Sequence, residues 1–148
     1  MEIPKIGEWT FDATNIANNF DAHVREQLPW YDLATDAVCH VIRHYLPKNG
    51  LLYDIGASTG NITKSLSNIL MNREAKAISI DSSQSMCEKF TGYGEIIHEC
   101  AENFQYKDFD CAVLFLTLMF VNERERKPLM DRLFSKIKKD GENEDELV

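Results

Sequence analysis

Apolar residues return every three or four positions in the first third of the chain and gather into short runs in the remainder. The first pattern predicts two helices, over residues 12–27 and 31–45, each followed by a proline. The expected buried stripes fall at every fourth position: Ile16, Phe20, Val24 and Leu28 in the first helix, and Leu33, Ala37, Val41 and Tyr45 in the second, where Val38 and Ile42 widen the stripe.

The short apolar runs predict four buried strands, over residues 51–55, 76–80, 96–98 and 111–118, the last passing into a loop that ends at 121. Helical patterns separate them over residues 60–71, after Ser82 and Ser83, and over 123–138. Strands that alternate with helices predict an α/β fold with a parallel, Rossmann-like sheet of about four strands. The expected inward residues of two of these helices are Ile62, Leu66, Ile69 and Leu70, and Leu129, Leu133, Phe134 and Ile137.

The length of 148 residues suits one domain. We expect it over residues 1–141, as an N-terminal helical cap over 1–47 and a Rossmann-like core over 48–141. Residues 142–148 carry four acids and no base, which is typical of a solvated tail.

A glycine turn follows the first expected strand, in the sequence LLYDIGASTGNIT over residues 51–63. Gly56 and Gly60 lack a Cβ, so backbone amides there could approach a nucleotide-like ligand at the start of the next helix. Asp54 stands beside the turn and would repel a pyrophosphate, but it suits the ammonium group of S-adenosylmethionine. Asp81 ends the second strand, where an acid is placed to bind ribose hydroxyls.

With these elements in place, the chain resembles class I S-adenosylmethionine-dependent methyltransferases, and more closely their carboxy-S-adenosylmethionine synthase branch. The resemblance covers nearly the whole chain up to residue 141. It rests on GEWTFD (7–12), LPWY (28–31), YDIGASTG (53–60), ISIDSSQSM (78–86) and LFLTLMFVNERERKPLMDRLFSKIKKDG (114–141).

The resemblance implies a role for individual residues around S-adenosylmethionine. Gly56, Ala57 and Ser58 would wrap its methionine part, and Asp81 would bind the ribose hydroxyls with Ser82 beside it. Tyr31 would close over the sulfonium from the helical cap, while a core tyrosine at a helix start is the alternative.

Three departures from the family pattern concern the same site. Cys100 and Ala101 stand where an acid usually accepts from the adenine amino group, so adenine binding would depend on the Ala101 backbone and apolar stacking. Phe115 replaces an asparagine near the end of the fourth strand. No position matches the arginine that holds the extra carboxylate of the synthase product.

The family strand order is 3-2-1-4-5-7-6, so the resemblance implies the order 3-2-1-4 here, with the fourth strand as an apolar edge. A homodimer or a partner chain would cover this edge. A truncated or frameshifted reading frame is one explanation of the acidic tail.

Charge and cysteine content narrow the class of protein. The net charge of −8 disfavours nucleic-acid binding, and the basic residues after position 123 recur at helical spacing with apolar ones, as on a solvated helix face. Four cysteines without CxxC spacing indicate reduced thiols and a cytoplasmic protein. No apolar run approaches the length of a membrane span.

Other candidate residues have an ordinary structural explanation. His40 and His44 have metal-binding spacing, but they lack the HExxH glutamate and enclose Arg43, so no metal is expected. His98 is expected to be a strand residue rather than a general base. Glu102 and Asn103 could contact the ligand from the loop of Cys100 and Ala101, but a solvent-exposed position is expected for both.

The sequence therefore predicts a methyltransferase-like protein that binds S-adenosylmethionine as a small-molecule cofactor, with no catalytic base assigned and the acceptor unidentified. Two alternatives stay open. One is carboxy-S-adenosylmethionine synthesis for wobble-uridine modification of transfer RNA. The other is a truncated, non-catalytic cofactor-binding or interaction module.

Overall fold

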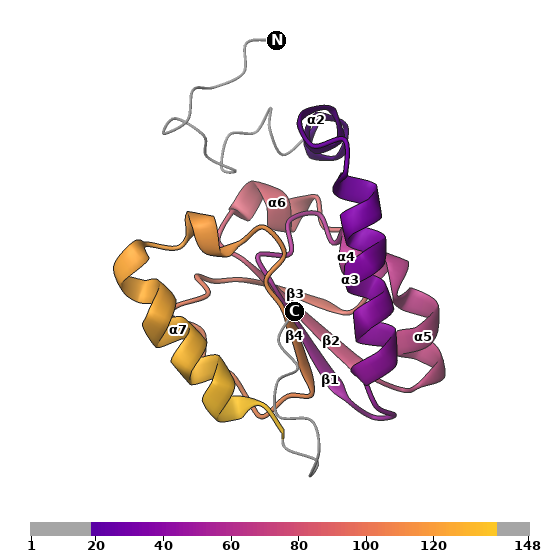
Figure 1. Ribbon diagram of the computed structural model, residues 1–148, viewed down its shortest axis with the longest axis vertical. Coiled ribbons are helices and arrows are strands. Elements are labelled where there is room, and N and C mark those ends of the chain that lie inside the picture. Colours follow the sequence, from indigo (N-terminus) through magenta and orange to yellow (C-terminus); the bar gives the residue numbers. More distant parts are fainter. Residues whose placement is uncertain (1–18, 139–148) are drawn as a thin grey trace.

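Four parallel strands form the centre of the computed structural model, which describes residues 19–138 (Figure 1). They are β1 (Leu51–Ile55), β2 (Lys76–Asp81), β3 (Glu95–His98) and β4 (Cys111–Val113). The strand order is β3-β2-β1-β4, so both the α/β class and the predicted order are confirmed. Because every strand is parallel, the carboxyl ends of all four lie at one edge of the sheet.

Helices cover both faces of this sheet and give three layers (Figure 1). On one face α3 (Tyr31–Tyr45), α4 (Asn61–Ser65) and α5 (Ser67–Asn72) pack against the strands. On the other face lies α7 (Glu123–Lys136). The shorter α2 (Phe20–Gln27), α6 (Gln84–Glu88) and the 3-10 helix η1 (Leu118–Phe120) surround the carboxyl edge of the sheet.

The N-terminal helix is described from Phe20 onward, and Phe20 and Val24 are buried as predicted. The earlier part of the expected helix, with Ile16, lies outside the described residues. The GEWTFD sequence and the acidic tail also lie outside them.

The predicted inward stripe of α3 is wrong at Leu33, which is 74% exposed, and at Val41 and Tyr45, which are also exposed. The residues predicted to widen it are confirmed, since Ile42 is fully buried and Val38 packs partly buried against the core. The helix also buries Tyr31, Thr35 and Cys39, and the Cys39 thiol donates to the Ile62 carbonyl of α4 at 3.8 Å. α3 carries two adjacent apolar stripes, and the one with the smaller Thr35 and Cys39 allows the closer approach to α4.

The helix expected over residues 60–71 is divided into α4 and α5. Leu66 interrupts it with φ −94° and ψ 1°, although its side chain is fully buried. Ile62 and Leu70 are also buried and Ile69 is partly buried, so the predicted inward residues of this segment are confirmed.

β4 is much shorter than predicted. After Val113 the chain leaves the sheet, and Leu116 adopts a left-handed conformation with φ 55°. Thr117 then donates through Oγ1 to the Ile55 carbonyl at 2.8 Å. The apolar residues after Val113 therefore form a loop over the carboxyl end of β1 rather than more of a central strand.

β4 is the outermost strand of the described sheet on its side, and its three residues are buried. The chain returns to this edge after α7, where Ile137 forms a parallel bridge with Phe109. Phe109 donates its N–H to the Lys136 carbonyl at 3.0 Å, and Lys138 donates to the Phe109 carbonyl at 2.8 Å. Phe109 is thus paired from outside the sheet just before β4 begins.

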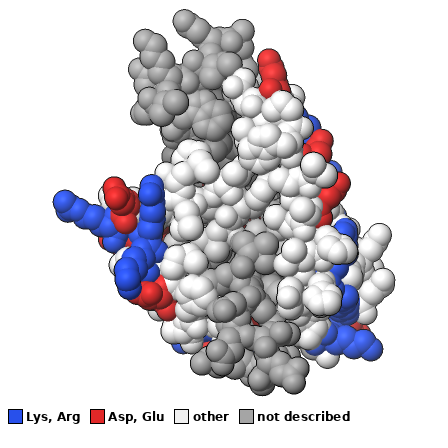
Figure 2. Space-filling model, viewed as in Figure 1, with Lys and Arg blue, Asp and Glu red and all other residues white. Residues whose placement is uncertain are grey.

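α7 has a charged outer surface on which both signs alternate, as Figure 2 shows along one side of the molecule. Lys127 pairs with Asp131 at 2.8 Å, and both side chains are exposed. This agrees with the prediction of a solvated helix face. No described helix is both long and apolar enough to cross a membrane.

The predicted inner face of α7 is correct at Leu129 and Leu133 but wrong at Phe134, which is 44% exposed.

We expect Leu133→Ala to lower the free energy of unfolding by about 2–5 kcal/mol, because it leaves a cavity at a fully buried position. Phe134→Ala should cost less than about 1 kcal/mol. Urea unfolding followed by circular dichroism measures both, and equal losses would contradict this orientation of the helix.

Candidate functional site

A cavity of about 790 Å³ lies at the carboxyl edge of the sheet. Its floor consists of the ends of β1 and β2, and its walls come from α2, the start of α3, the turn after β3 and the loop after β4. Ligands of open parallel sheets bind at this edge, where the connections on either side of β1 diverge. The cavity volume falls within the usual range of small-molecule sites.

The glycine turn after β1 is held in one shape by close contacts. Gly56 has φ 75°, and a Cβ there would lie 2.4 Å from Thr117 Oγ1. Gly60 has φ 90°, and its Cβ would lie 2.6 Å from the backbone nitrogen of Gly92. Thr91 donates its N–H to the Thr59 carbonyl at 2.9 Å beside this contact. Both glycines are therefore required by close packing as well as by their positive φ.

The backbone amides of this turn bond within the protein. Gly56 and Ala57 both donate to the Ile80 carbonyl, at 2.8 and 3.0 Å, and Ser58 donates to Asp81 Oδ2 at 2.8 Å. These three N–H groups thus join the turn to the end of β2. The expectation that the amides there face a ligand is wrong for them, and the turn instead supplies a rigid surface.

Asp81 lies at the end of β2 and lines the cavity, next to Ser82. Its carboxylate also organises the protein around it, since Oδ2 accepts from Ser58 and Oδ1 accepts from the Ser83 N–H at 2.9 Å. Ser83 is the N-cap of α6 and accepts from the Met86 N–H at 3.3 Å.

Asp54 is a buried acid without a hydrogen-bond partner at Oδ2, at the end of β1. It is 2% exposed and lines the cavity. Burial, and secondarily the negative charge of Asp81, raise the pKa of Asp54 to about 7. A buried acid with an unpaired oxygen is costly, and a cationic ligand group would stabilise its ionised form.

The turn after β3 brings four neighbouring residues to the cavity, of which Glu99 was not among the sequence candidates. Cys100 and Ala101 line the cavity as predicted, together with Glu99 and Glu102. Burial raises the pKa of the Cys100 thiol, and Glu102 and Glu99 add to the effect. Glu102 is half-buried and lines the cavity, so the alternative of a ligand contact stays open for it, whereas Asn103 is exposed as expected.

The backbone of Ala101 is partly occupied, since its carbonyl accepts from the Tyr106 hydroxyl at 2.8 Å. Glu99 and Glu102, which flank Cys100 and Ala101, are further candidate acceptors in this turn, although Glu99 Oε1 also accepts from the Cys100 N–H at 2.9 Å.

Tyr31, at the start of α3, lines the cavity. Its ring is buried, lies 5.5 Å from that of Phe115 and also belongs to the apolar core of the cap. Tyr31 is therefore a core residue that also lines the cavity, and its contact with the sulfonium stays a prediction. Burial raises the pKa of its hydroxyl.

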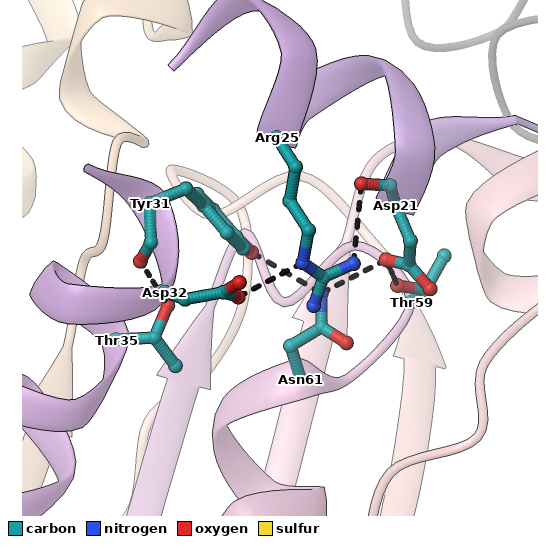
Figure 3. A network of polar contacts seen from close by, with 7 residues as sticks. All are labelled: Asp21, Arg25, Tyr31, Asp32, Thr35, Thr59 and Asn61. Carbon is teal, nitrogen blue, oxygen red and sulfur yellow. Dashed lines mark hydrogen bonds and ion pairs between the residues drawn. The ribbon is translucent and has the colours of Figure 1, made fainter. Parts of the chain in front are cut away.

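A polar network joins the helical cap to the glycine turn (Figure 3). Thr59 Oγ1 and Asn61 Nδ2 both donate to Asp21 Oδ1, at 3.0 and 2.9 Å, and Asn61 Nδ2 also contacts the Tyr31 hydroxyl at 3.2 Å. Arg25 pairs with Asp32 at 2.8 Å. Sequence reasoning missed Asp21, since an exposed acid on a short helix gives no signal of a partner 38 residues away.

Other candidates lie away from the cavity. His40 and His44 are exposed on α3, and the described residues hold no cluster that could bind a metal ion. His98 is an exposed residue of β3 whose Nε2 lies 3.0 Å from the Ser82 carbonyl oxygen. The cavity thus gathers all the residues that the sequence analysis assigned to cofactor binding except Gly60, which supports the turn from behind.

Comparison with known proteins agrees with this geometry. A family model described as a methyltransferase domain matches residues 52–141. The chain belongs to the class I S-adenosylmethionine-dependent methyltransferase family. The match includes the cavity floor and all four strands, apart from the first residue of β1.

Curated relatives of this methyltransferase-family chain include carboxy-S-adenosyl-L-methionine synthases. That of Staphylococcus epidermidis is 32% identical over 139 residues, which are 90% of this chain and 60% of the relative. That of Pectobacterium atrosepticum is 26% identical over 150 residues, covering 95% and 60%. The chain thus spans about 60% of the length of these relatives.

Solved structures confirm the Rossmann-like fold. The plantazolicin methyltransferase BpumL, in complex with a monoazolic desmethylPZN analog and SAH, matches with a TM-score of 0.64 and 18% identity, over 86% of this chain and 50% of that one. A SAM-bound amino pentose methyltransferase from Micromonospora echinaspora matches with a TM-score of 0.63 and 17% identity, over 80% and 51%.

The raised pKa of Asp54 predicts a pH-dependent cost to folding. The unfolded chain releases this proton near pH 4 and the folded chain near pH 7, so stability falls as pH rises between these values, by at most about 1.4 kcal/mol per pH unit. Asp54→Asn should therefore gain stability relative to the unmodified protein between pH 5 and 8, by roughly 3–10 °C in Tm.

Differential scanning fluorimetry across this pH range measures the gain. The exposed Asp108→Asn is the matched control and should show no trend. Parallel Tm curves for Asp54→Asn and the unmodified protein would contradict the raised pKa.

Proposed function

We propose that this chain binds S-adenosylmethionine in the cavity and belongs to an enzyme that transfers its methyl group. The observation that carries the proposal is the unpartnered carboxyl of Asp54, buried beside a second acid at the carboxyl edge of the sheet. No described lysine or arginine lines the cavity. These groups suit a nucleoside that is cationic and free of phosphate, and they oppose a dinucleotide.

Individual residues receive their roles from their positions. Asp81 would accept from the ribose hydroxyls, with Ser82 beside it. Asp54 would face the cationic amino-acid portion, along the surface formed by Gly56, Ala57 and Ser58. Cys100, Ala101 and Phe115 would border the purine and the reacting end.

When bound, S-adenosylmethionine supplies a methyl group on a sulfonium that leaves as neutral S-adenosylhomocysteine. The residues of this chain then have three tasks: Asp81 orients the nucleoside, Asp54 balances positive charge, and Tyr31 with Phe115 excludes water from one side. Such alignment and desolvation account for much of the acceleration of a methyl transfer, so a dedicated base is not required.

Carboxy-S-adenosylmethionine synthesis is the second candidate, favoured by the names of the curated relatives. Against it stands the absence of a lysine or arginine among the described residues that line the cavity, because the extra carboxylate of that product needs a cation. A transfer RNA role belongs to this second candidate. A non-catalytic cofactor-binding module is the third, and an assay of S-adenosylhomocysteine formation separates it from the first two.

Two further properties are part of the proposal. A reducing, cytoplasmic compartment agrees with the four cysteines, which all lie in the described residues as free thiols. A partner at the β4 edge agrees with the position of β4 as an outer strand. Size-exclusion chromatography with light scattering tests the partner, and a monomer at all concentrations would contradict a homodimer.

Asp81→Asn should weaken the binding of S-adenosylmethionine at least tenfold in isothermal titration calorimetry. The substitution keeps the shape of the side chain but removes a charged acceptor, whose hydrogen bonds contribute about 1.5–3 kcal/mol. The exposed Asp108→Asn makes the same chemical change away from the cavity and should bind as the unmodified protein does.

A thermal melt distinguishes lost binding from lost folding, because Asp81 also accepts from Ser58 and Ser83. Unchanged affinity in a folded Asp81→Asn variant would refute the role of this acid. A folded, unmodified protein that binds neither S-adenosylmethionine nor S-adenosylhomocysteine would refute the proposed function as a whole.

A further inference from the structure

We infer that the methyl acceptor is a flat, largely apolar molecule that is neutral or positively charged and carries no carboxylate or phosphate. The inference rests on the proposed function and names the substrate class of the same site. Three observations carry it: the apolar composition of two segments that line the cavity, the sign of the charged groups that line it, and the protein contacts that already occupy the nearby cations.

Two segments far apart in the sequence, residues 24–31 and 115–120, contribute mostly apolar side chains to the cavity lining, with Gln27 and Thr117 as their polar members. We call the apolar and aromatic members the apolar wall, which consists of Val24, Leu28, Trp30, Tyr31, Phe115, Leu116, Met119 and Phe120.

The apolar wall brings together three kinds of aromatic ring. Tyr31 and Phe115 contact each other across the two segments at 5.5 Å with their planes tilted by 42°, and Trp30 directly precedes Tyr31. Trp30 is 46% exposed and Met119 is 59% exposed, although both line the cavity. Aromatic faces and a polarisable thioether bind flat apolar bodies and tolerate a cation.

The described lining residues include four carboxylic acids, whose ionised forms repel an anion: Asp54, Asp81, Glu99 and Glu102. No described lysine, arginine or histidine lines the cavity. An anionic acceptor would therefore enter a partly desolvated site without any described counter-charge.

The cations near the cavity are already bound to protein groups. Arg25 lies over the Tyr31 ring at 5.8 Å, outside the set of lining residues, and pairs with Asp32. Arg126 donates to the carbonyls of Val121 and Met119, at 3.0 and 3.3 Å, and thereby holds η1 in place. Recruiting either one for an anionic acceptor would break these contacts.

Three naphthalene probes of the same size test the charge preference. They are 2-naphthylmethylamine, 2-naphthol and 2-naphthoate, which are a cation, a neutral molecule and an anion at neutral pH. Each is titrated into protein saturated with S-adenosylhomocysteine and labelled with ¹³C at the methionine methyl groups. We expect the amine and the naphthol to bind at least tenfold more tightly than the naphthoate and to shift the Met119 resonance.

Matched variants locate the binding. Met119→Ala and Trp30→Ala should each weaken the amine and the naphthol at least threefold. The controls are Met71→Ala, whose methionine is 61% exposed on α5, and Leu33→Ala on α3, and neither should change the affinity. All four positions are exposed, so folding should be preserved in each variant, as circular dichroism verifies.

Each outcome decides for or against the inference. Equal or tighter binding of the naphthoate overturns it, and so does binding that shifts Met71 but not Met119. A protein that holds S-adenosylhomocysteine but none of the probes overturns the acceptor class while the proposed function survives. A protein that fails to bind S-adenosylhomocysteine refutes the proposed function. In that case the three naphthalene probes are titrated into the protein without S-adenosylhomocysteine, and their relative affinities test the charge preference of the apolar wall on its own.

Discussion

Two carboxylates near the ends of neighbouring parallel strands determine the shape and the charge of the cavity in this structure. Because β1 and β2 pair in register through Ile55 and Ile80, Asp54 and Asp81 both reach the same edge of the sheet. Asp81 receives N–H donors from both of its neighbouring loops, whereas Asp54 Oδ2 receives none. Asp81 thus holds the turn after β1 and the start of α6 in place, and Asp54 is left to interact with what the cavity binds.

The sequence predicts well those parts of the fold where a local sequence pattern is compatible with only one backbone structure. The run that becomes β2 ends at Asp81, the run that becomes β1 carries Asp54 one residue before its end, and the glycines after β1 need positive φ, so the strand ends and the turn follow directly. Asp54 and Asp81 belong to this class, because parallel strands place their carboxyl ends together whatever the surroundings.

Other features could not be predicted because the pattern is compatible with two outcomes. α3 carries two apolar stripes, and only its approach to α4 through Cys39 selects the buried one. The apolar run after Val113 resembles a central strand, yet it lines a cavity, and hydropathy cannot distinguish these two forms of burial. The links from Asp21 to Thr59 and from Gly56 to Thr117 join segments whose proximity is set by the whole fold.

The contact between Gly60 and Gly92 limits which substitutions this chain can accept during evolution. Each glycine occupies space that the other would need for a side chain, and Thr91 fastens the two loops together at the same place. A substitution at either position cannot be accommodated by a smaller residue at the other, because nothing is smaller than glycine. Descendants of this sequence are therefore expected to keep both glycines or to lose both when the loops separate, so the pair should be inherited as a unit.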